Sequence, residues 1–265
     1  MSAPHEEAAL ARVPDLPQWI DTRGMLHTGR ALVTFPSSQC LFSDGFVVEL
    51  ASRALLSAID NPPGEIVTER ACAMQGEVNV LCAEDTAETV GNALPSWVRR
   101  GVRLLALPGV MPWEYEPSDS DVAIFTRAST PSLAHVPETL RREIVDALEG
   151  HPSARFVPGK RPERSPADAS PTPVPVAAVL MDGRPVAFCY PVVQTETLWD
   201  VSVETLEGFR GRQLAARAAR AMVRHMRGSH KAPVWGALET NAASLSVARQ
   251  LGFEEAGRLM VFART

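Results

Sequence analysis

One stretch of the chain decides how the rest is interpreted: residues 198–216, with the sequence Leu-Trp-Asp-Val-Ser-Val-Glu-Thr-Leu-Glu-Gly-Phe-Arg-Gly-Arg-Gln-Leu-Ala-Ala. Its start, Leu198 to Glu204, is rich in apolar and β-branched residues and predicts a β-strand. From about Gln213 to Arg227, apolar residues recur on one face of a helix and arginines on the other. The stretch therefore predicts a strand that passes through a short turn into a helix.

The turn carries two arginines around a glycine, Arg210-Gly211-Arg212. Amides in the first turn of a helix have no partner inside the helix and lie at the positive end of its dipole, so they bind phosphate readily. The arginines add positive charge, and the small residues Gly211, Ala215 and Ala216 leave room for a diphosphate at the backbone. Taken alone, the turn fits either a pyrophosphate site or an ordinary connection between a strand and a helix.

Further elements are predicted around this stretch. Two strands joined by the hairpin turn Asp182-Gly183-Arg184 precede it, and a strand, a short helix capped by Asn241 and a last hairpin arm follow it. The predicted ranges are Val176–Met181 and Pro185–Val193 before the turn, then Val234–Leu238, a helix ending near Gly252, and Glu254–Arg264.

In this order the elements resemble the core of the GNAT acetyltransferases. The family signature Arg/Gln-x-x-Gly-x-Gly/Ala lies over Arg210–Ala215. A second motif, Asn-x-x-Ser/Ala followed by a helix and Gly-Phe, lies over Asn241–Ser244 and Leu251–Phe253. The resemblance covers about residues 176–265 and is closest to a subfamily with a long N-terminal extension.

The resemblance implies an N-acetyltransferase that moves an acetyl group from acetyl-CoA, as co-substrate and without a metal, to an amine of a small molecule or a protein. It also implies that the backbone amide near Val203 polarises the acetyl carbonyl. The residues expected to bind acetyl-CoA are Val203, Arg210, Gly211, Arg212, Gln213, Leu214, Ala215, Ala216, Asn241 and Ser244. The resemblance leaves open the acceptor, the length of the acyl chain and the oligomeric state.

An acceptor amine is mostly protonated at neutral pH, so a base must remove a proton before attack. Glu196, Asp200 and Glu204 lie on the strand that family members place beside the thioester. Glu204 is the predicted base, because it directly precedes the turn and matches an acidic position of the subfamily. A solvated carboxylate at the end of a strand is the competing interpretation.

Two residues depart from the family pattern. Gln213 stands at the central glycine of the first motif, and Ala248 stands where many members carry a tyrosine that protonates the departing thiolate. Ser244, Ser246 or water would have to supply that proton, and a thiolate with a pKa near ~8.5 leaves without strong acid help. The departures favour a second hypothesis, a catalytically weak acyl-CoA-binding regulatory module.

The whole chain is predicted to be α/β (α+β), with a GNAT-like mixed sheet flanked by helices at residues 176–265 and a smaller α/β domain at residues 1–151. The proline-rich residues 152–175 are the expected linker. No phosphate-binding loop or nucleophile motif occurs in the first domain, which we expect to shape the acceptor site. Its predicted strands are Ala31–Phe35, Val78–Ala83, Val102–Leu107 and Val122–Arg127, and its predicted helices are Gly45–Ile59, Thr86–Arg100 and Pro137–Leu148.

The composition of the chain limits the compartment and the kinds of partner that we expect. Four scattered cysteines form no metal or disulfide pattern and predict buried thiols in a reducing compartment. No secretory signal or membrane span is evident, so we expect a cytoplasmic protein that does not bind membranes. Residues 1–150 hold 11 Lys/Arg and 21 Asp/Glu. In so acidic a chain we interpret the arginines at 217, 220, 224 and 227 as a solvated helix face, and expect no nucleic-acid binding.

Overall fold

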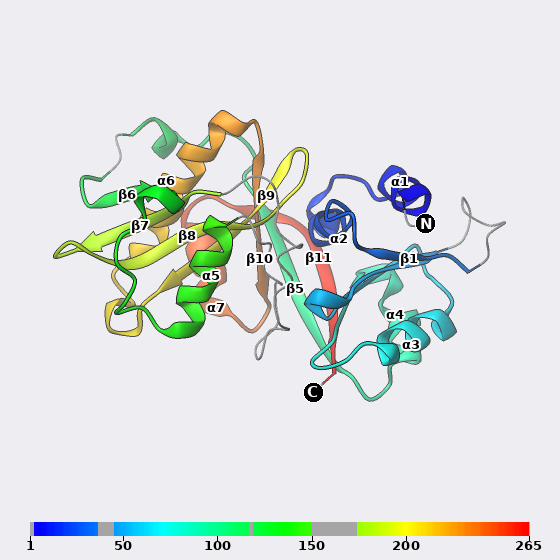
Figure 1. Cartoon of the computed structure of the whole chain (residues 1–265). Coiled ribbons are helices and arrows are strands. Elements are labelled where there is room, and N and C mark those ends of the chain that lie inside the picture. The colour runs from blue at the N-terminus through cyan, green and yellow to red at the C-terminus, as the bar shows by residue number, and fades with distance from the viewer. Residues whose placement is uncertain (1–2, 37–44, 117–118, 150–173, 265) are drawn as a thin grey trace.

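The computed structural model describes residues 3–36, 45–116, 119–149 and 174–264. Its strands form one mixed sheet of eleven strands in the order β1-β2-β3-β4-β11-β5-β10-β9-β8-β7-β6. Figure 1 shows two lobes joined by long central strands. The strands are β1 (Leu32–Thr34), β2 (Phe46–Leu50), β3 (Leu55–Ile59), β4 (Asn79–Ala83), β5 (Val98–Ala106), β6 (Val122–Phe125), β7 (Val176–Met181), β8 (Arg184–Gln194), β9 (Leu198–Thr205), β10 (Ala232–Leu238) and β11 (Glu254–Ala263).

Helices cover both faces of the sheet in each lobe. They are α1 (Ala3–Arg12), α2 (Ile20–Leu26), α3 (Gly64–Ala73), α4 (Ala87–Ala93), α5 (Glu138–Leu148), α6 (Leu214–Met226) and α7 (Ala242–Gln250). In the first lobe, α1 and α2 pack on one face of β1–β4, and α3 and α4 pack on the other. The mixed α/β architecture predicted from the sequence is confirmed.

The helix predicted at Gly45–Ile59 is wrong. These residues form the antiparallel strands β2 and β3, joined by a short 3-10 turn that ends at Ala54 in a left-handed conformation (φ 48°). Every residue of both strands is buried, because helices cover both faces. A strand buried on both sides shows no alternation of apolar and polar residues, so its pattern resembles that of a buried helix.

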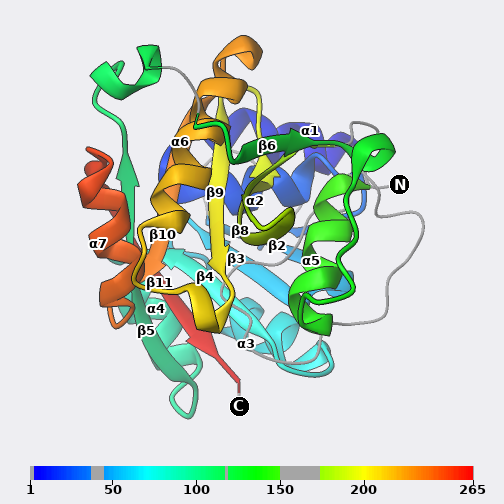
Figure 2. The ribbon, with the colours of Figure 1, turned by 90° about the vertical axis from the view of Figure 1, so that its left-hand side faces the viewer.

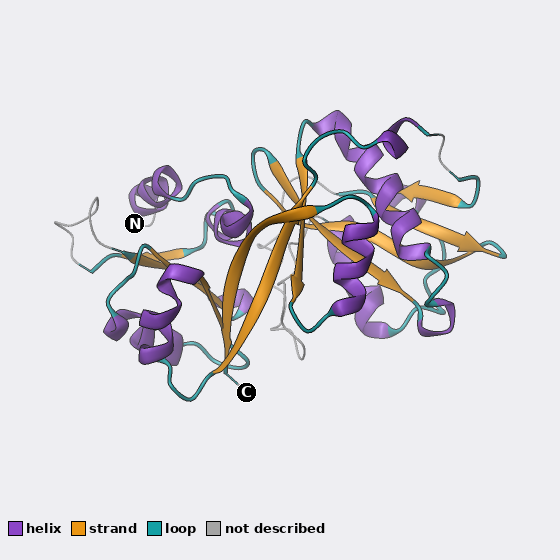
Figure 3. Cartoon of the chain, turned by 180° about the vertical axis from the view of Figure 1, so that it is seen from behind, coloured by secondary structure: helices purple, strands orange, loops and turns teal. Residues whose placement is uncertain are grey.

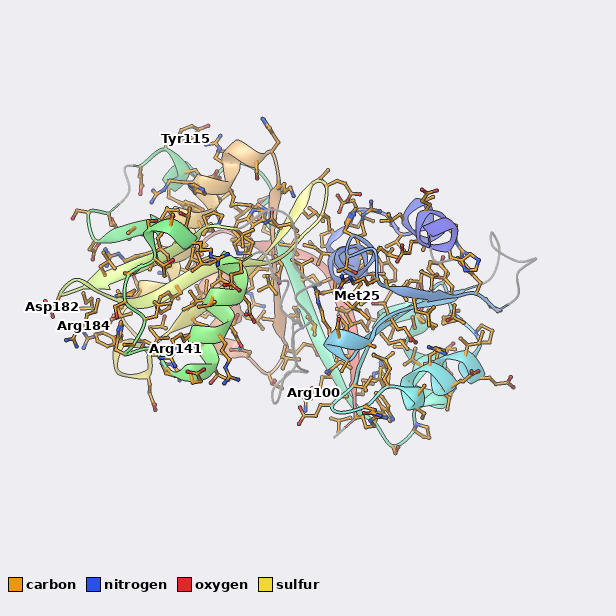
Figure 4. All side chains as sticks on the ribbon, in the orientation of Figure 1. Met25, Arg100, Tyr115, Arg141, Asp182 and Arg184 are labelled. Atoms are coloured by element: carbon orange, nitrogen blue, oxygen red, sulfur yellow. The ribbon has the colours of Figure 1, made fainter. Side chains whose placement is uncertain are left out.

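The elements predicted for residues 176–252 are present in the second lobe, which also contains β6 and α5, two elements that the prediction assigned to the first domain. Helix α6 packs on one face of β7, β8 and β9, and α5 packs on the other face of β7 and β8. Figure 2 shows α6 and α7 on one side of these strands and α5 on the opposite side. The predicted turn between β7 and β8 is present, with Asp182 at φ 50° and Gly183 at φ 74°. Asp182 and Arg184 mark its tip at the far edge of the lobe in Figure 4.

The two lobes share the middle of the sheet. Strand β5, from the first half of the chain, lies between β10 and β11, and β11 pairs antiparallel with both β4 and β5. Figure 3 shows these long curved strands crossing the centre of the molecule. The last strand is therefore not the hairpin arm predicted for Glu254–Arg264, because its partners come from the first half. The sheet has no break at the expected boundary, and residues 152–173 of the expected linker lie outside the described residues.

The cysteines differ in their exposure. Cys82 and Cys189 are buried thiols, as expected, whereas Cys72 is exposed on α3. Burial raises the pKa of Cys82 to about 12 and that of Cys189 well above its usual value. The expected buried thiol at position 40 lies outside the described residues. No helix in the described ranges is long and apolar enough to cross a membrane.

Candidate active site

Two neighbouring parallel strands of the second lobe diverge. Strands β9 and β10 are paired only at their beginnings, from Leu198 opposite Ala232 to Asp200 opposite Val234. Beyond this point β10 no longer pairs with β9, and it stays paired with β5 on its other side. The edge of β9 from Val201 to Thr205 consequently faces no other strand of the described chain. Such an edge presents backbone groups that a ligand can use.

The amide of Val203 points into this opening. Along an antiparallel pair, residues alternate in the direction of their backbone N–H and C=O groups. These groups point toward the partner strand at one residue and away from it at the next. The amide of Leu206 donates to the carbonyl of Val186 at 2.9 Å, and Cys189 lies opposite Val203 in the same register. By that alternation the N–H of Val203 points away from β8, toward the side where β10 has diverged. This is the orientation that the predicted role in polarising a carbonyl requires.

The turn from β9 into α6 ends at an uncapped helix start. The first hydrogen bond within α6 runs from the amide of Arg217 to the carbonyl of Gln213 at 3.2 Å. The amides of Leu214, Ala215 and Ala216 precede it and have no acceptor in the part of the chain that the structure describes, and no side chain caps the helix. A thirteen-residue helix with free amides at its positive end fits an anionic group.

The residues before the helix leave that space open. Gly211 has φ +76°, and a Cβ added there would meet nothing within 4 Å. Arg210, Arg212 and Gln213 are all exposed. The guanidinium of Arg210 donates to the carbonyl of Thr205 at 3.3 Å, and that of Arg212 lies 5.7 Å from the centre of the Phe209 ring. Both positive charges therefore lie on the turn itself.

Gln213 shows why the family pattern has a glycine at this position. It is the N-cap residue of α6 and has φ 58° and ψ 16°, a left-handed conformation. A residue with a Cβ is strained in this region, whereas glycine is not. The departure from the motif therefore imposes strain on the backbone and leaves the amides of the following turn in place.

The second motif builds the start of α7. The side chain of Asn241 accepts a hydrogen bond from the amide of Ser244 at 3.1 Å, which confirms the predicted N-cap. The hydroxyl of Ser244 accepts a hydrogen bond from the indole N–H of Trp235, on β10, at 2.9 Å. With its oxygen held by Trp235, the hydroxyl of Ser244 keeps its own hydrogen available for a further acceptor.

The Gly-Phe pair closes the same helix. Gly252 follows α7 with φ +88°, and Phe253 is buried with its ring 5.4 Å from that of Trp235. Ala248 is fully buried in the same cluster. It lies one turn after Ser244 on the same helix face, since residues four apart are neighbours. The hydroxyl nearest to the position of the family tyrosine is thus that of Ser244.

Glu204 lies beside an apolar wall and a second carboxylate. In the register of β8 and β9, Phe188 lies opposite Glu204 and Tyr190 lies opposite Ser202. Part of the Glu204 side chain is exposed to solvent. Its pKa is raised, first because neighbouring protein atoms displace some of the water around the carboxylate and then because of the negative charge of Glu143, while Arg210 acts in the opposite direction. A carboxylate with a raised pKa is a stronger base.

The other two candidate carboxylates have different surroundings: Glu196 lies in the turn before β9, and Asp200 lies on β9. The Nε of Arg23 donates to Glu196 at 3.0 Å, and His27 lies 3.1 Å from the same carboxylate. The hydrogen bond from Arg23 is the main cause that lowers the pKa of Glu196 to about 2, which makes it a poor base. Asp200 is 2% exposed and lies where β9 and β10 are still paired. Of the three predicted candidates, Glu204 is the one beside the open edge.

The arginine face of α6 is not solvated as expected. Arg217 forms ion pairs with Asp119 and Asp121, and Arg224 donates to the carbonyls of Trp113 and Glu116. The guanidinium of Arg227 lies 5.1 Å from the centre of the Tyr115 ring, and that ring points outward at the edge of the lobe in Figure 4. These arginines hold the segment between β5 and β6 against the helix. The sequence separation of about a hundred residues hid these partners.

Two residues near Glu204 were also missed. Tyr190 was interpreted only as part of a strand, and Glu143 only as part of a helix. The phenol of Tyr190 donates to the carboxylate of Glu143 at 2.9 Å, although the two residues come from opposite sides of the proline-rich segment. No motif marks either of them, and only the packing of α5 on β8 brings them together.

Comparison with known proteins agrees with this geometry. Residues 177–262 match the family model of the GNAT acetyltransferases. The C-terminal part of the chain is therefore similar to the GNAT acetyltransferases. The matched range contains the open edge of β9, the turn at Arg210–Gln213 and the start of α7.

Solved structures share the fold along nearly the whole chain, including the part before the matched residues. A GCN5-related N-acetyltransferase-like protein from Streptococcus suis aligns with a TM-score of 0.64 and 14% identity, covering 100% of both chains. A GCN5-related N-acetyltransferase from Kribbella flavida aligns with a TM-score of 0.57 and 15% identity over 93% of each chain. A GNAT-family protein from Novosphingobium aromaticivorans gives 0.56 and 18%, covering 94% and 96%. No curated protein sequence matches the chain.

Proposed function

We propose that the protein is an N-acetyltransferase that uses acetyl-CoA to acetylate an amine of a small molecule or a protein. One observation carries the proposal: an uncapped helix start with two exposed arginines adjoins an unpaired strand edge that ends at a carboxylate with a raised pKa. The first part suits a pyrophosphate, and the second suits an acyl group and its acceptor. The GNAT family match supports the same reaction.

The described residues fit acetyl-CoA. The free amides of Leu214, Ala215 and Ala216 would hold its pyrophosphate, with Arg210 and Arg212 adding charge. The open space at Gly211 admits the phosphates close to the backbone. Bound in this way, acetyl-CoA supplies an acetyl thioester, whose carbonyl carbon is open to attack by a neutral amine.

The chain's own groups then perform three tasks. Glu204 accepts a proton from the acceptor ammonium and so produces the neutral amine. The N–H of Val203 donates to the carbonyl oxygen, where negative charge develops. The hydroxyl of Ser244, whose oxygen is fixed by Trp235, donates a hydrogen bond to the departing sulfur. The amine nitrogen bonds to the carbonyl carbon while the carbon–sulfur bond breaks, and CoA leaves as a thiolate with a pKa near ~8.5, so it needs no strong acid. The second proton of the amine passes to this thiolate or to water.

The test is to measure binding and transfer separately. Isothermal calorimetry of the full chain with acetyl-CoA should show binding, and the double variant Arg210→Ala/Arg212→Ala should bind well over tenfold more weakly. Charge-assisted hydrogen bonds are each worth roughly 1.5–3 kcal/mol. The matched control Arg184→Ala/Arg249→Ala removes equal charge from two exposed positions outside the turn and should bind normally.

Mass spectrometry of an amine library incubated with acetyl-CoA should then reveal an acetylated product. Equal affinity in the two double variants would remove the pyrophosphate site. Tight binding without any acetylated amine would leave the regulatory acyl-CoA-binding module as the function.

A further inference from the structure

A second carboxylate is held against the strand that carries the proposed base. Helix α5 packs on β7 and β8, and Tyr190 on β8 is fully buried beneath it. A buried phenol needs a hydrogen-bond partner, and this one donates to the Oε2 atom of Glu143 at 2.9 Å. The bond fixes one carboxylate oxygen of α5 above the sheet.

The strand register brings this pair to the same face as Glu204. Tyr190 lies opposite Ser202, and Ser202 and Glu204 share one face of β9 because they are two residues apart. Tyr190 is thus a diagonal neighbour of Glu204 across the two strands. Burial is the main cause that raises the pKa of Tyr190, and the charges of Glu143 and Glu204 raise it further.

Few charged groups act on Glu204 from the packed elements. Within the described ranges they are Glu143 from α5 and Arg210 from the turn before α6, and the titratable phenol of Tyr190 on β8 stays neutral. Glu143 favours the protonated form of Glu204 and Arg210 favours the ionised form. A fixed negative charge at this place attracts an acceptor ammonium and strengthens the pull of Glu204 on its proton.

We propose that Glu143 and Tyr190 are positioning residues of the base: Tyr190 holds the carboxylate of Glu143 beside Glu204, and its fixed charge prepares Glu204 to take a proton from a cationic amine. The catalytic part of this inference rests on the proposed function. The electrostatic coupling of the two carboxylates is measurable without turnover.

The deciding experiment is a carbon-13 NMR titration of the Glu204 carboxyl in the full chain without ligand. In Glu143→Gln the midpoint should fall by about half a pH unit or more, because a like charge has been removed. Tyr190→Phe should lower it by less, since Glu143 keeps its charge but loses its anchor. Glu138→Gln, on the same helix and paired with Arg141 and Arg142, is the control and should leave the midpoint unchanged.

The pH dependence of acetyl transfer is the second measurement. The acid limb of kcat/KM, which reports the free protein, should move to lower pH in Glu143→Gln by the same amount as the titration, and the KM for the amine should rise. A Glu204 midpoint that is unchanged in Glu143→Gln, in a variant with a native circular dichroism spectrum, overturns the inference even if acetylation is observed. A shifted midpoint in a protein that acetylates no amine sustains the coupling and rejects the proposed function instead.

Discussion

Single residues decide how the turn before α6 can bind a diphosphate. Gly211 and Gln213 both have positive φ, at 76° and 58°, on either side of Arg212. Glycine meets that demand without strain, and glutamine does not. The left-handed conformation of Gln213 leads the chain into α6 and leaves the amides after it free. The motif therefore keeps its backbone path without the central glycine.

Substitutions at position 213 should report this strain. Gln213→Gly should have a free energy of unfolding about 1 kcal/mol higher than Gln213→Ala, because only the alanine variant keeps a Cβ in the left-handed region. Urea unfolding of the two variants is the measurement. The glycine variant should also bind acetyl-CoA at least as tightly as the parent chain. Equal stability of both variants would show that the backbone is not held in this conformation.

The three candidate bases have different surroundings, so substitution of each one should have a different effect. Glu204→Gln should lower kcat by ~10²- to 10⁴-fold and leave the affinity for acetyl-CoA nearly intact, as expected for the loss of a base. In the parent chain the rate should rise with pH through the raised pKa of Glu204, because only the ionised form accepts a proton.

Glu196→Gln should instead affect stability. The folded pKa of Glu196 is lowered from 4.5 to about 2, chiefly by Arg23, so its stabilising contribution is present above pH 4.5 and is lost as the pH falls toward 2. Chemical denaturation of the variant and the parent should therefore differ at pH 7 and converge in acid. A loss of kcat in Glu196→Gln larger than in Glu204→Gln would move the base to position 196.

At the scale of elements, the most consequential contact is between α6 and the segment before β6. The helix presents its apolar face to the sheet and its arginines to residues 112–116 and 119–121, so both of these faces are covered. Arg220 adds a cation–π contact with the ring of Trp113 at 5.9 Å. The helix that offers its free amides to a ligand is thereby fixed from two directions.

Removing one of these arginines should loosen the segment. In Arg224→Ala the carbonyls of Trp113 and Glu116 lose their donor, so amides near residues 112–116 should exchange faster, consistent with a local loss of about 1–3 kcal/mol. Hydrogen exchange with mass spectrometry is the measurement, and Arg249→Ala, exposed on α7, is the control. Exchange that is unchanged in Arg224→Ala would mean that the packing of Trp113 and the contacts of Arg217 and Arg227 hold the segment without Arg224.

At the scale of the whole molecule, the central strands join the two halves of the chain. Strand β11 lies between β4 and β5, and β10 has β5 on the side away from β9. The GNAT-like part of the chain, residues 177–262, therefore completes its sheet with strands from the first half. Sheets whose central strands lose their neighbours expose long unpaired edges and apolar faces.

A fragment of residues 174–265 should consequently fail to fold as a monomer. It lacks β4 and β5, so β11 would have no partner and β10 would keep only its short pairing with β9. We expect aggregation or the absence of a cooperative thermal transition, measured by circular dichroism and light scattering. The control is the same fragment co-expressed with residues 1–151, which should give a soluble complex. A monomeric fragment with a cooperative transition would show that the domain is complete without the first half.

By itself, the sequence determined most elements of residues 176–252 and their resemblance to the GNAT acetyltransferases. The strands β7–β9, the hairpin turn at Asp182–Gly183, the helix α6 and the cap at Asn241 all depend on local periodicity and turn chemistry, which short segments encode. Glu204 and the turn at Arg210–Gln213 lie on one continuous stretch, so local patterns together with the family resemblance led to the predictions of a base and a phosphate site there.

Only the tertiary structure decided what depends on distant neighbours. It showed that residues 45–59 are two strands, because burial on both faces removes the pattern that separates strand from helix. It also separated the candidate carboxylates by their partners, with Arg23 beside Glu196 in the turn before β9 and Glu143 beside Glu204 on β9. Side chains more than a hundred residues apart become neighbours through sheet order and helix packing, which the apolar pattern of a single segment does not encode.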